Sequence, residues 1–367
     1  MRVLAAICGC CVLALVLVDA FDTVVLARRT RHMFRSARLF YWLTWDPFAA
    51  VSRRIQSSRA REGFLSVYGP LSLLLLFGLW AVALVVAFGL LRWAVSTGTL
   101  GTYFYNSATT LFTLGTGDPK QPAGKLIAVI EGSLGLGFLG LVVGYLPVLY
   151  QSFSQRELRI SLLDTRGGSP PSASALLQSC PSGPDSFERE LALWEEWAAQ
   201  LLETHVSFPM LAYFRSQHAN QSWLTALVAM MDCAAVVSLC TQENLSRQAS
   251  LTFAIGRHAL LDTVVIFGLE KDVNRSQQRA MIDHAKLAQI LGSKQPLFDA
   301  RLFSEAKLAK LRQLYEPQAC ALSSYFLMSL PAWISDQASQ ENWRVDLLQR
   351  EDVPFAVSDP FSTEEQE

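Results

Sequence analysis

The chain has 367 residues, enough for two domains, and 51% of them are hydrophobic, with a mean hydropathy of +0.25. A formal net charge of −1 gives no indication of a nucleic-acid partner. The seven cysteines show neither a CxxC pair nor a His/Cys spacing that would hold zinc. The apolar residues concentrate in the first 150 residues, which predicts a membrane domain followed by amphipathic helices.

Three stretches are long and apolar enough to cross a bilayer, which takes about 20 residues each. They run from Val3 to Leu26, from Leu71 to Leu91 and from Leu126 to Tyr150. The first stretch is also compatible with a cleaved signal peptide. Cleavage would require the arginines behind it to be translocated, so we interpret it as an uncleaved transmembrane helix.

The loop between the first two stretches holds nine arginines, from Arg28 to Arg61, against two acidic residues, Asp46 and Glu62. The loop before the third stretch has only Lys120 and Lys125 beside Asp118. Because basic loops stay in the cytoplasm, the N-terminus and the second loop are expected outside and the chain after the third stretch inside. This predicts a multi-pass protein of the plasma or inner membrane.

An aromatic cluster, Phe40–Trp45, lies within the basic loop. Rings beside arginines are typical of a helix in the headgroup region, and we expect Arg28–Arg61 to contact anionic lipid. The alternative is an aromatic patch buried against the C-terminal domain.

Between the second and third stretches, Thr102–Phe112 is apolar enough to enter a membrane but too short to cross it. Such a segment predicts a re-entrant half-helix. A glycine-containing run, Thr113-Leu114-Gly115-Thr116-Gly117-Asp118, follows directly. A cation that leaves water needs oxygens in place of its hydration shell, and backbone carbonyls supply them where glycine lets them point one way.

These residues resemble the two-transmembrane, one-pore-loop potassium channel family over about Leu71 to Tyr150. Thr110, Thr113, Gly115, Gly117 and Asp118 stand as in the family signature, and Leu114 replaces its valine. The resemblance implies an outer helix, a pore helix, a selectivity filter and an inner helix in a homotetramer. It also implies K⁺ sites at Thr113, Leu114, Gly115 and Thr116, with no cofactor besides the permeant ion.

Two residues depart from the family pattern. Thr116 stands where a tyrosine or phenylalanine usually braces the filter, and Phe112 stands where a small threonine is common. Loss of the aromatic brace puts strict potassium selectivity in doubt, because selectivity depends on the number and stiffness of the carbonyls. A nonselective cation channel therefore remains an alternative, as does a non-conducting membrane-anchored signalling or scaffolding protein.

The third stretch is predicted to be the inner helix. Its small and bending residues, expected to permit close contact and gating, are Gly135, Gly137, Gly140, Gly144 and Pro147. Glu131 lies one turn in from the outer end. An intramembrane carboxylate is a functional candidate, and a structural role behind the filter is the alternative we favour here.

The rest of the sequence predicts an all-α bundle. The expected organisation is an N-terminal transmembrane helix (1–27), a basic linker (28–66), the pore domain (67–152), a second linker (153–184), a cytoplasmic helical domain (185–350) and an acidic tail (351–367). Trp223–Cys240 and Leu251–Leu269 approach spanning length, but their charged residues favour buried soluble helices.

No enzyme is predicted. His258 and Asp262 share one helix face, where a buried ion pair is a simpler interpretation than a metal or acid–base site. No GxGxxG follows a predicted strand, so no nucleotide-binding regulatory domain of that kind is expected. The sequence does not indicate what cytoplasmic ligand or partner gates the channel.

Overall fold

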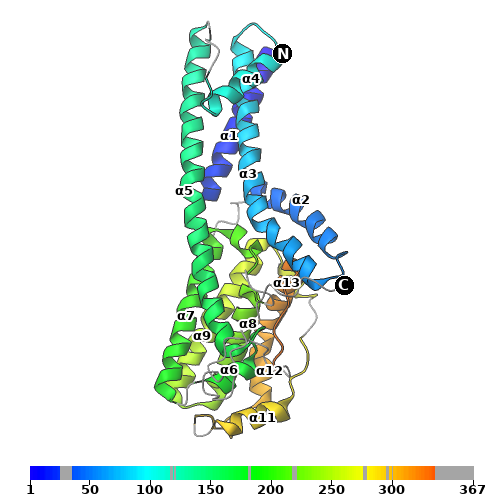
Figure 1. Cartoon of the computed structure of the whole chain (residues 1–367), viewed down its shortest axis with the longest axis vertical. Coiled ribbons are helices and arrows are strands. Elements are labelled where there is room, and N and C mark those ends of the chain that lie inside the picture. Colours follow the sequence, from blue (N-terminus) through cyan, green and yellow to red (C-terminus); the bar gives the residue numbers. More distant parts are fainter. Residues whose placement is uncertain are drawn as a thin grey trace, which may run out of the picture.

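The computed structural model describes residues 1–24, 35–115, 119, 121–180, 183–216, 221–275, 279–294, 297–299 and 301–334. Within these residues all regular secondary structure is helical, as predicted (Figure 1). One end of the elongated molecule is formed by long apolar helices, and the other by a helical bundle.

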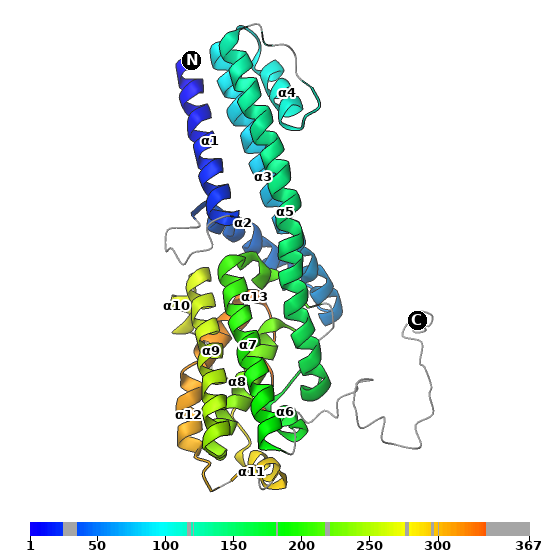
Figure 2. The ribbon, with the colours of Figure 1, turned by 90° about the vertical axis from the view of Figure 1, so that its left-hand side faces the viewer.

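The apolar end is built from α1 (Arg2–Val24), α3 (Ser58–Val95) and α5 (Pro122–Gly167), each containing one predicted span. These three helices are long and apolar enough to cross a membrane. A short helix, α4 (Leu100–Leu111), lies at the same end as the N-terminus, between α3 and α5 along the chain (Figure 2). The molecule is thus a multi-pass membrane protein by its helix composition.

Helix α1 packs along α3. Gly9 permits this contact, because a Cβ at that position would lie 2.9 Å from the carbonyl oxygen of Ala87. Trp80 Nε1 donates a hydrogen bond to Asp19 Oδ2 at 2.9 Å. These contacts join α1 to the core of the apolar end.

Helix α2 (Arg35–Ser52) carries the aromatic cluster of the basic loop. The ring of Tyr41 stacks on Tyr213 of the C-terminal domain, with centroids 5.1 Å apart, and Trp45 Nε1 donates to the Tyr325 carbonyl at 3.1 Å. Trp42 remains exposed. Tyr41 and Trp45 therefore pack against the C-terminal domain, as the buried-patch alternative predicted. The face of α2 that carries Trp42 stays exposed.

The C-terminal domain packs around α8 (Trp223–Cys240), an apolar helix of 18 residues that is 89% buried. The surrounding elements are α6 (Ala173–Ser179), α7 (Pro184–Ser207), the 3₁₀ helix η1 (Pro209–Tyr213), α9 (Glu243–Phe267), α10 (Glu270–Val273), α11 (His284–Ser293), α12 (Glu305–Gln313) and α13 (Glu316–Phe326). Burial of α8 agrees with its interpretation as a core helix.

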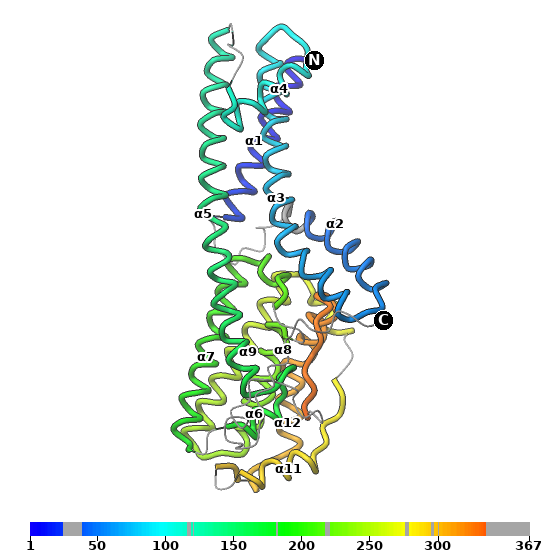
Figure 3. The backbone as a smooth tube through the Cα atoms, in the orientation of Figure 1, coloured from blue at the N-terminus to red at the C-terminus, as the bar shows by residue number. Residues whose placement is uncertain are grey.

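The segment 153–184, predicted as a linker, differs from that prediction. Helix α5 runs on through Pro147 to Gly167, far beyond its apolar part (Figure 3). Helix α6 follows, and its Leu176 and Leu177 are buried in the domain core. Gly, Ser and Pro dominate the composition here, but these two leucines are enough to anchor a helix once a core lies beside them.

Candidate functional site: a pore loop and its support

The run after α4 begins with an unusual backbone. Thr113 has φ +57° and Gly115 has φ +113°, whereas Leu114 between them does not have a positive φ. The left-handed φ of Thr113 is typical of the residue that ends a helix, and the φ of Gly115 is one that glycine tolerates and larger residues resist. Thr116, Gly117 and Asp118, the other predicted filter residues, lie outside the described residues.

Helix α4 aims its C-terminal end at this run. The Leu114 backbone N–H donates to the Thr109 carbonyl at 2.8 Å, so the chain leaves the helix in a tight turn. The helix dipole places partial negative charge at that end, which favours a cation beyond it. Phe112 and Leu114 are 43% and 79% exposed, so their side chains find little cover within one chain.

Helix α5 packs closely on α4 through Gly135. A Cβ on Gly135 would lie 2.3 Å from the carbonyl oxygen of Leu111, a distance that no side chain can occupy. Gly135, predicted as a gating glycine, thus holds a packing contact. Gly137, Gly140 and Gly144 face open space in this chain.

A buried ion pair lies behind the pore loop. Glu131 Oε2 is 2.6 Å from Arg92 Nη2, and both side chains are almost completely buried. Arg92 also donates to the Thr110 hydroxyl at 2.8 Å, while the Ser107 hydroxyl donates to the other carboxylate oxygen of Glu131. The network joins α3, α4 and α5, in agreement with a structural role for Glu131.

Sequence reasoning missed Arg92. It stands one position beyond the second apolar stretch and looks like an ordinary flanking cation. A signal was nevertheless present, because a carboxylate one turn inside a membrane helix requires a nearby cation or proton donor. Arg92 is the basic residue closest to the outer end of the second stretch.

The lower part of α5 is tied to the C-terminal domain through η1. Arg156 is buried and donates to the carbonyls of Leu211 and Phe214 at 2.8 and 2.9 Å. Phe214 in turn packs on α3, where a Cβ on Gly69 would lie 2.7 Å from its ring. Helix α5, which follows the pore loop, is therefore bound directly to the C-terminal domain through these hydrogen bonds.

His258 and Asp262 lie 3.3 Å apart on α9, with His258 half exposed. The ion pair is present, but the prediction that it is buried was wrong, because this face of α9 is turned toward solvent. Among the residues that the structure describes, no three His, Cys, Asp or Glu side chains gather as a metal site.

Two membrane-length helices, a half-helix between them and a glycine-containing turn at its C-terminal end define a pore-loop domain. A family model described as an ion channel matches residues 73–151, from within α3 to the middle of α5. The match confirms, over this segment, the resemblance drawn from the filter residues. No curated protein and no solved structure matches the chain.

Proposed function

We propose that this protein is one subunit of a homotetrameric channel that conducts K⁺ passively through the backbone carbonyls of Thr113 to Gly117. The observation that carries the proposal is a half-helix between two membrane-length helices that ends in a turn with a glycine of positive φ, Gly115. An ion-coordinating ring needs several such loops around one axis, and one chain supplies one.

The open surfaces of the chain support assembly. Leu114 is 79% exposed, and Leu136 and Val143 on α5 are 66% and 71% exposed. Neighbouring copies would cover the filter side, and lipid would cover the outer side. We place the N-terminus outside and the C-terminal domain in the cytoplasm, on the basis of the arginines between α1 and α3. The same arginines would contact anionic lipid.

A nonselective cation channel is the second candidate, favoured by Thr116 in place of the usual aromatic brace. Thr116→Tyr distinguishes the two. If the natural pore is nonselective, this substitution narrows its permeability toward K⁺; if it is already selective, the permeability ratio changes little.

The proposal is tested by K⁺ flux into liposomes that contain the full-length protein. Gly115→Ala should abolish flux, because alanine is strained at φ +113°. Gly63→Ala is the matched control: Gly63 lies in α3 with open space around it, and flux should be unchanged. Protein that remains tetrameric and passes no cation would contradict conduction and favour the scaffolding alternative.

A further inference from the structure

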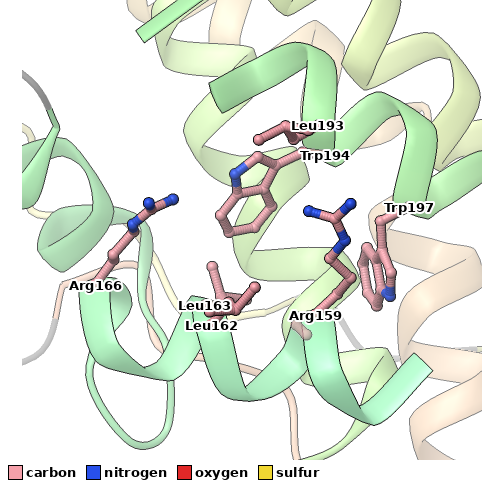
Figure 4. A pocket seen from close by; sticks show the side chains of 8 residues that line it. Arg159, Leu162, Leu163, Arg166, Leu193, Trp194 and Trp197 are labelled. Atoms are coloured by element: carbon pink, nitrogen blue, oxygen red, sulfur yellow. The ribbon is translucent and has the colours of Figure 1, made fainter. Parts of the chain in front are cut away.

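A hollow of about 490 Å³, including its open mouth, lies between the end of α5 and α7. Arg159 and Arg166 of α5 and Trp194 and Trp197 of α7 line it, with Leu162 and Leu163 among the apolar lining. Figure 4 shows the Trp194 ring between the two guanidinium groups and above the two leucines. The cavity itself measures only about 80 Å³, below the roughly 300–1,000 Å³ of enclosed small-molecule sites, so a ligand would lie largely in the open mouth.

The hollow carries net positive charge. Arg166 Nη1 pairs with Glu190 Oε1 at 2.7 Å, so most of its charge is balanced. Among the described residues, no acidic side chain forms an ion pair with Arg159. A guanidinium that is half buried beside an open hollow can bind a carboxylate or phosphate with two parallel hydrogen bonds.

The apolar part of the hollow fits a flat ring. The exposed face of Trp194 and the side chains of Leu162 and Leu163 form two walls of low polarity. An indole face stacks on any planar aromatic group, including a nucleobase. A ligand that satisfies both parts of the site therefore combines an anionic group with an aromatic ring.

The position of the hollow favours a soluble ligand over a lipid. Arg159 follows the last residue of the predicted span, Tyr150, by nine positions, which is about 14 Å along a helix. At that distance from the predicted span, headgroups at the bilayer surface are not expected to reach Arg159, whereas a soluble metabolite can.

We propose that this hollow binds a small soluble anion that carries an aromatic ring, of the nucleotide class, with its anionic group on Arg159 and its ring against Trp194. The Arg166–Glu190 pair closes the other end of the site. Because the hollow joins the last turns of α5 to α7, an occupant would alter how the pore-loop domain is coupled to the C-terminal domain. That consequence rests on the proposed channel function, whereas the binding site does not.

Calorimetry on the full-length protein in lipid nanodiscs tests the site, with ADP as the probe. ADP should bind, while adenosine (the ring without charge) and pyrophosphate (the charge without the ring) should each bind at least about tenfold more weakly. Equal binding of pyrophosphate and ADP would contradict the role of the ring. Absence of ADP binding at millimolar concentration would overturn the proposal.

Variants locate the binding. Arg159→Gln and Trp194→Leu should each weaken ADP about tenfold, and Arg159→Lys should retain part of the affinity. Arg189→Gln is the matched control, because Arg189 lies on α7 and donates to Ser186 outside the hollow. Unchanged affinity in Arg159→Gln would overturn the assignment.

Flux measured without ADP tests conduction separately, so failure of the channel and failure of the site remain distinguishable. With the natural protein, ADP should change the K⁺ flux, and Arg159→Gln should remove this response. Binding without any change of flux would contradict the coupling.

Discussion

Helices α5 and α8 are almost equally apolar, yet they are buried to opposite degrees. The most apolar 18-residue stretches of the two helices have mean hydropathies of 2.2 and 1.9. However, 11% of the stretch in α5 and 89% of the stretch in α8 is buried. Protein covers α8 on all sides, whereas a broad face of α5 is left for lipid or for further copies of the chain. Hydropathy alone thus identifies an apolar helix but does not tell whether protein or lipid surrounds it.

Each helix contains a buried carboxylate that pairs with an arginine distant in sequence, but the two pairs stabilise different regions. Glu131 and Arg92 join helices around the pore loop. Asp232 on α8 contacts Arg279 at 2.7 Å and accepts a hydrogen bond from Tyr315, so it fixes a loop and the start of α13. Burial alone would lower the pKa of Arg279, but the Asp232 carboxylate raises it above its usual value. The same chemistry holds the pore loop in one region and the C-terminal fold in the other.

The largest effect is expected from Glu131→Gln. It leaves Arg92 buried without a counter-charge, which costs about 3–5 kcal/mol, and loosens α4 from α5. K⁺ flux should be lost, as measured in liposomes. Ser133→Ala, an exposed residue on the same helix, is the control and should retain flux. Full flux in Glu131→Gln would show that the ion pair does not hold the pore loop.

Asp232→Asn should lower the free energy of unfolding of the C-terminal domain by about 3 kcal/mol, because Arg279 loses its closer ionic partner in the core and keeps only Glu316, at 3.5 Å. Urea unfolding followed by circular dichroism measures the change. If α5 and α8 differ as described, the K⁺ flux of the folded protein stays unchanged. Loss of flux at full stability would contradict this separation of roles.

The C-terminal domain should also lose stability in acid through His205. This side chain is buried under the Trp223 ring, and burial, assisted by the charge of Arg156, holds its pKa well below 6.5. Below pH 6.5 the unfolded chain takes up a proton that the folded domain does not, so the free energy of unfolding falls as the pH falls. Between pH 7.5 and 5.5 the loss is about 1.4 kcal/mol.

The variant His205→Phe separates this residue from the other titrating groups. It should remove most of the pH dependence between pH 7.5 and 5.5 in the same urea unfolding experiment. If the free energy of unfolding depends on pH as steeply in the variant as in the natural protein, His205 takes up its proton as readily in the folded domain as in the unfolded chain.

The smallest effect is expected at the surface of α9. His258→Ala breaks an exposed ion pair with Asp262, which is worth less than about 0.5 kcal/mol. Thermal unfolding should be nearly unchanged. A large loss of stability would mean that this pair acts as a core interaction like that of Asp232.

The sequence predicted the membrane-length helices, the half-helix and the helical C-terminal region, because hydrophobic length and periodicity are local properties. It did not predict the partner of Glu131, since Arg92 and Glu131 are brought together only by the packing of α3 on α5. The pairing of Asp232 with Arg279 could not be predicted either, because these residues also meet only through tertiary packing. Helix α6 was taken as linker because its composition outweighed two leucines that matter only beside α8.

Selective conduction of K⁺ through the Thr113–Gly117 loop, as proposed, is tested most directly by the reversal potential. It is measured on the full-length protein in a planar bilayer, with K⁺ on one side and Na⁺ on the other. A K⁺-selective pore should give a value close to the potassium equilibrium potential. A value near zero would contradict selectivity, and the absence of any current from intact tetramers would contradict conduction itself.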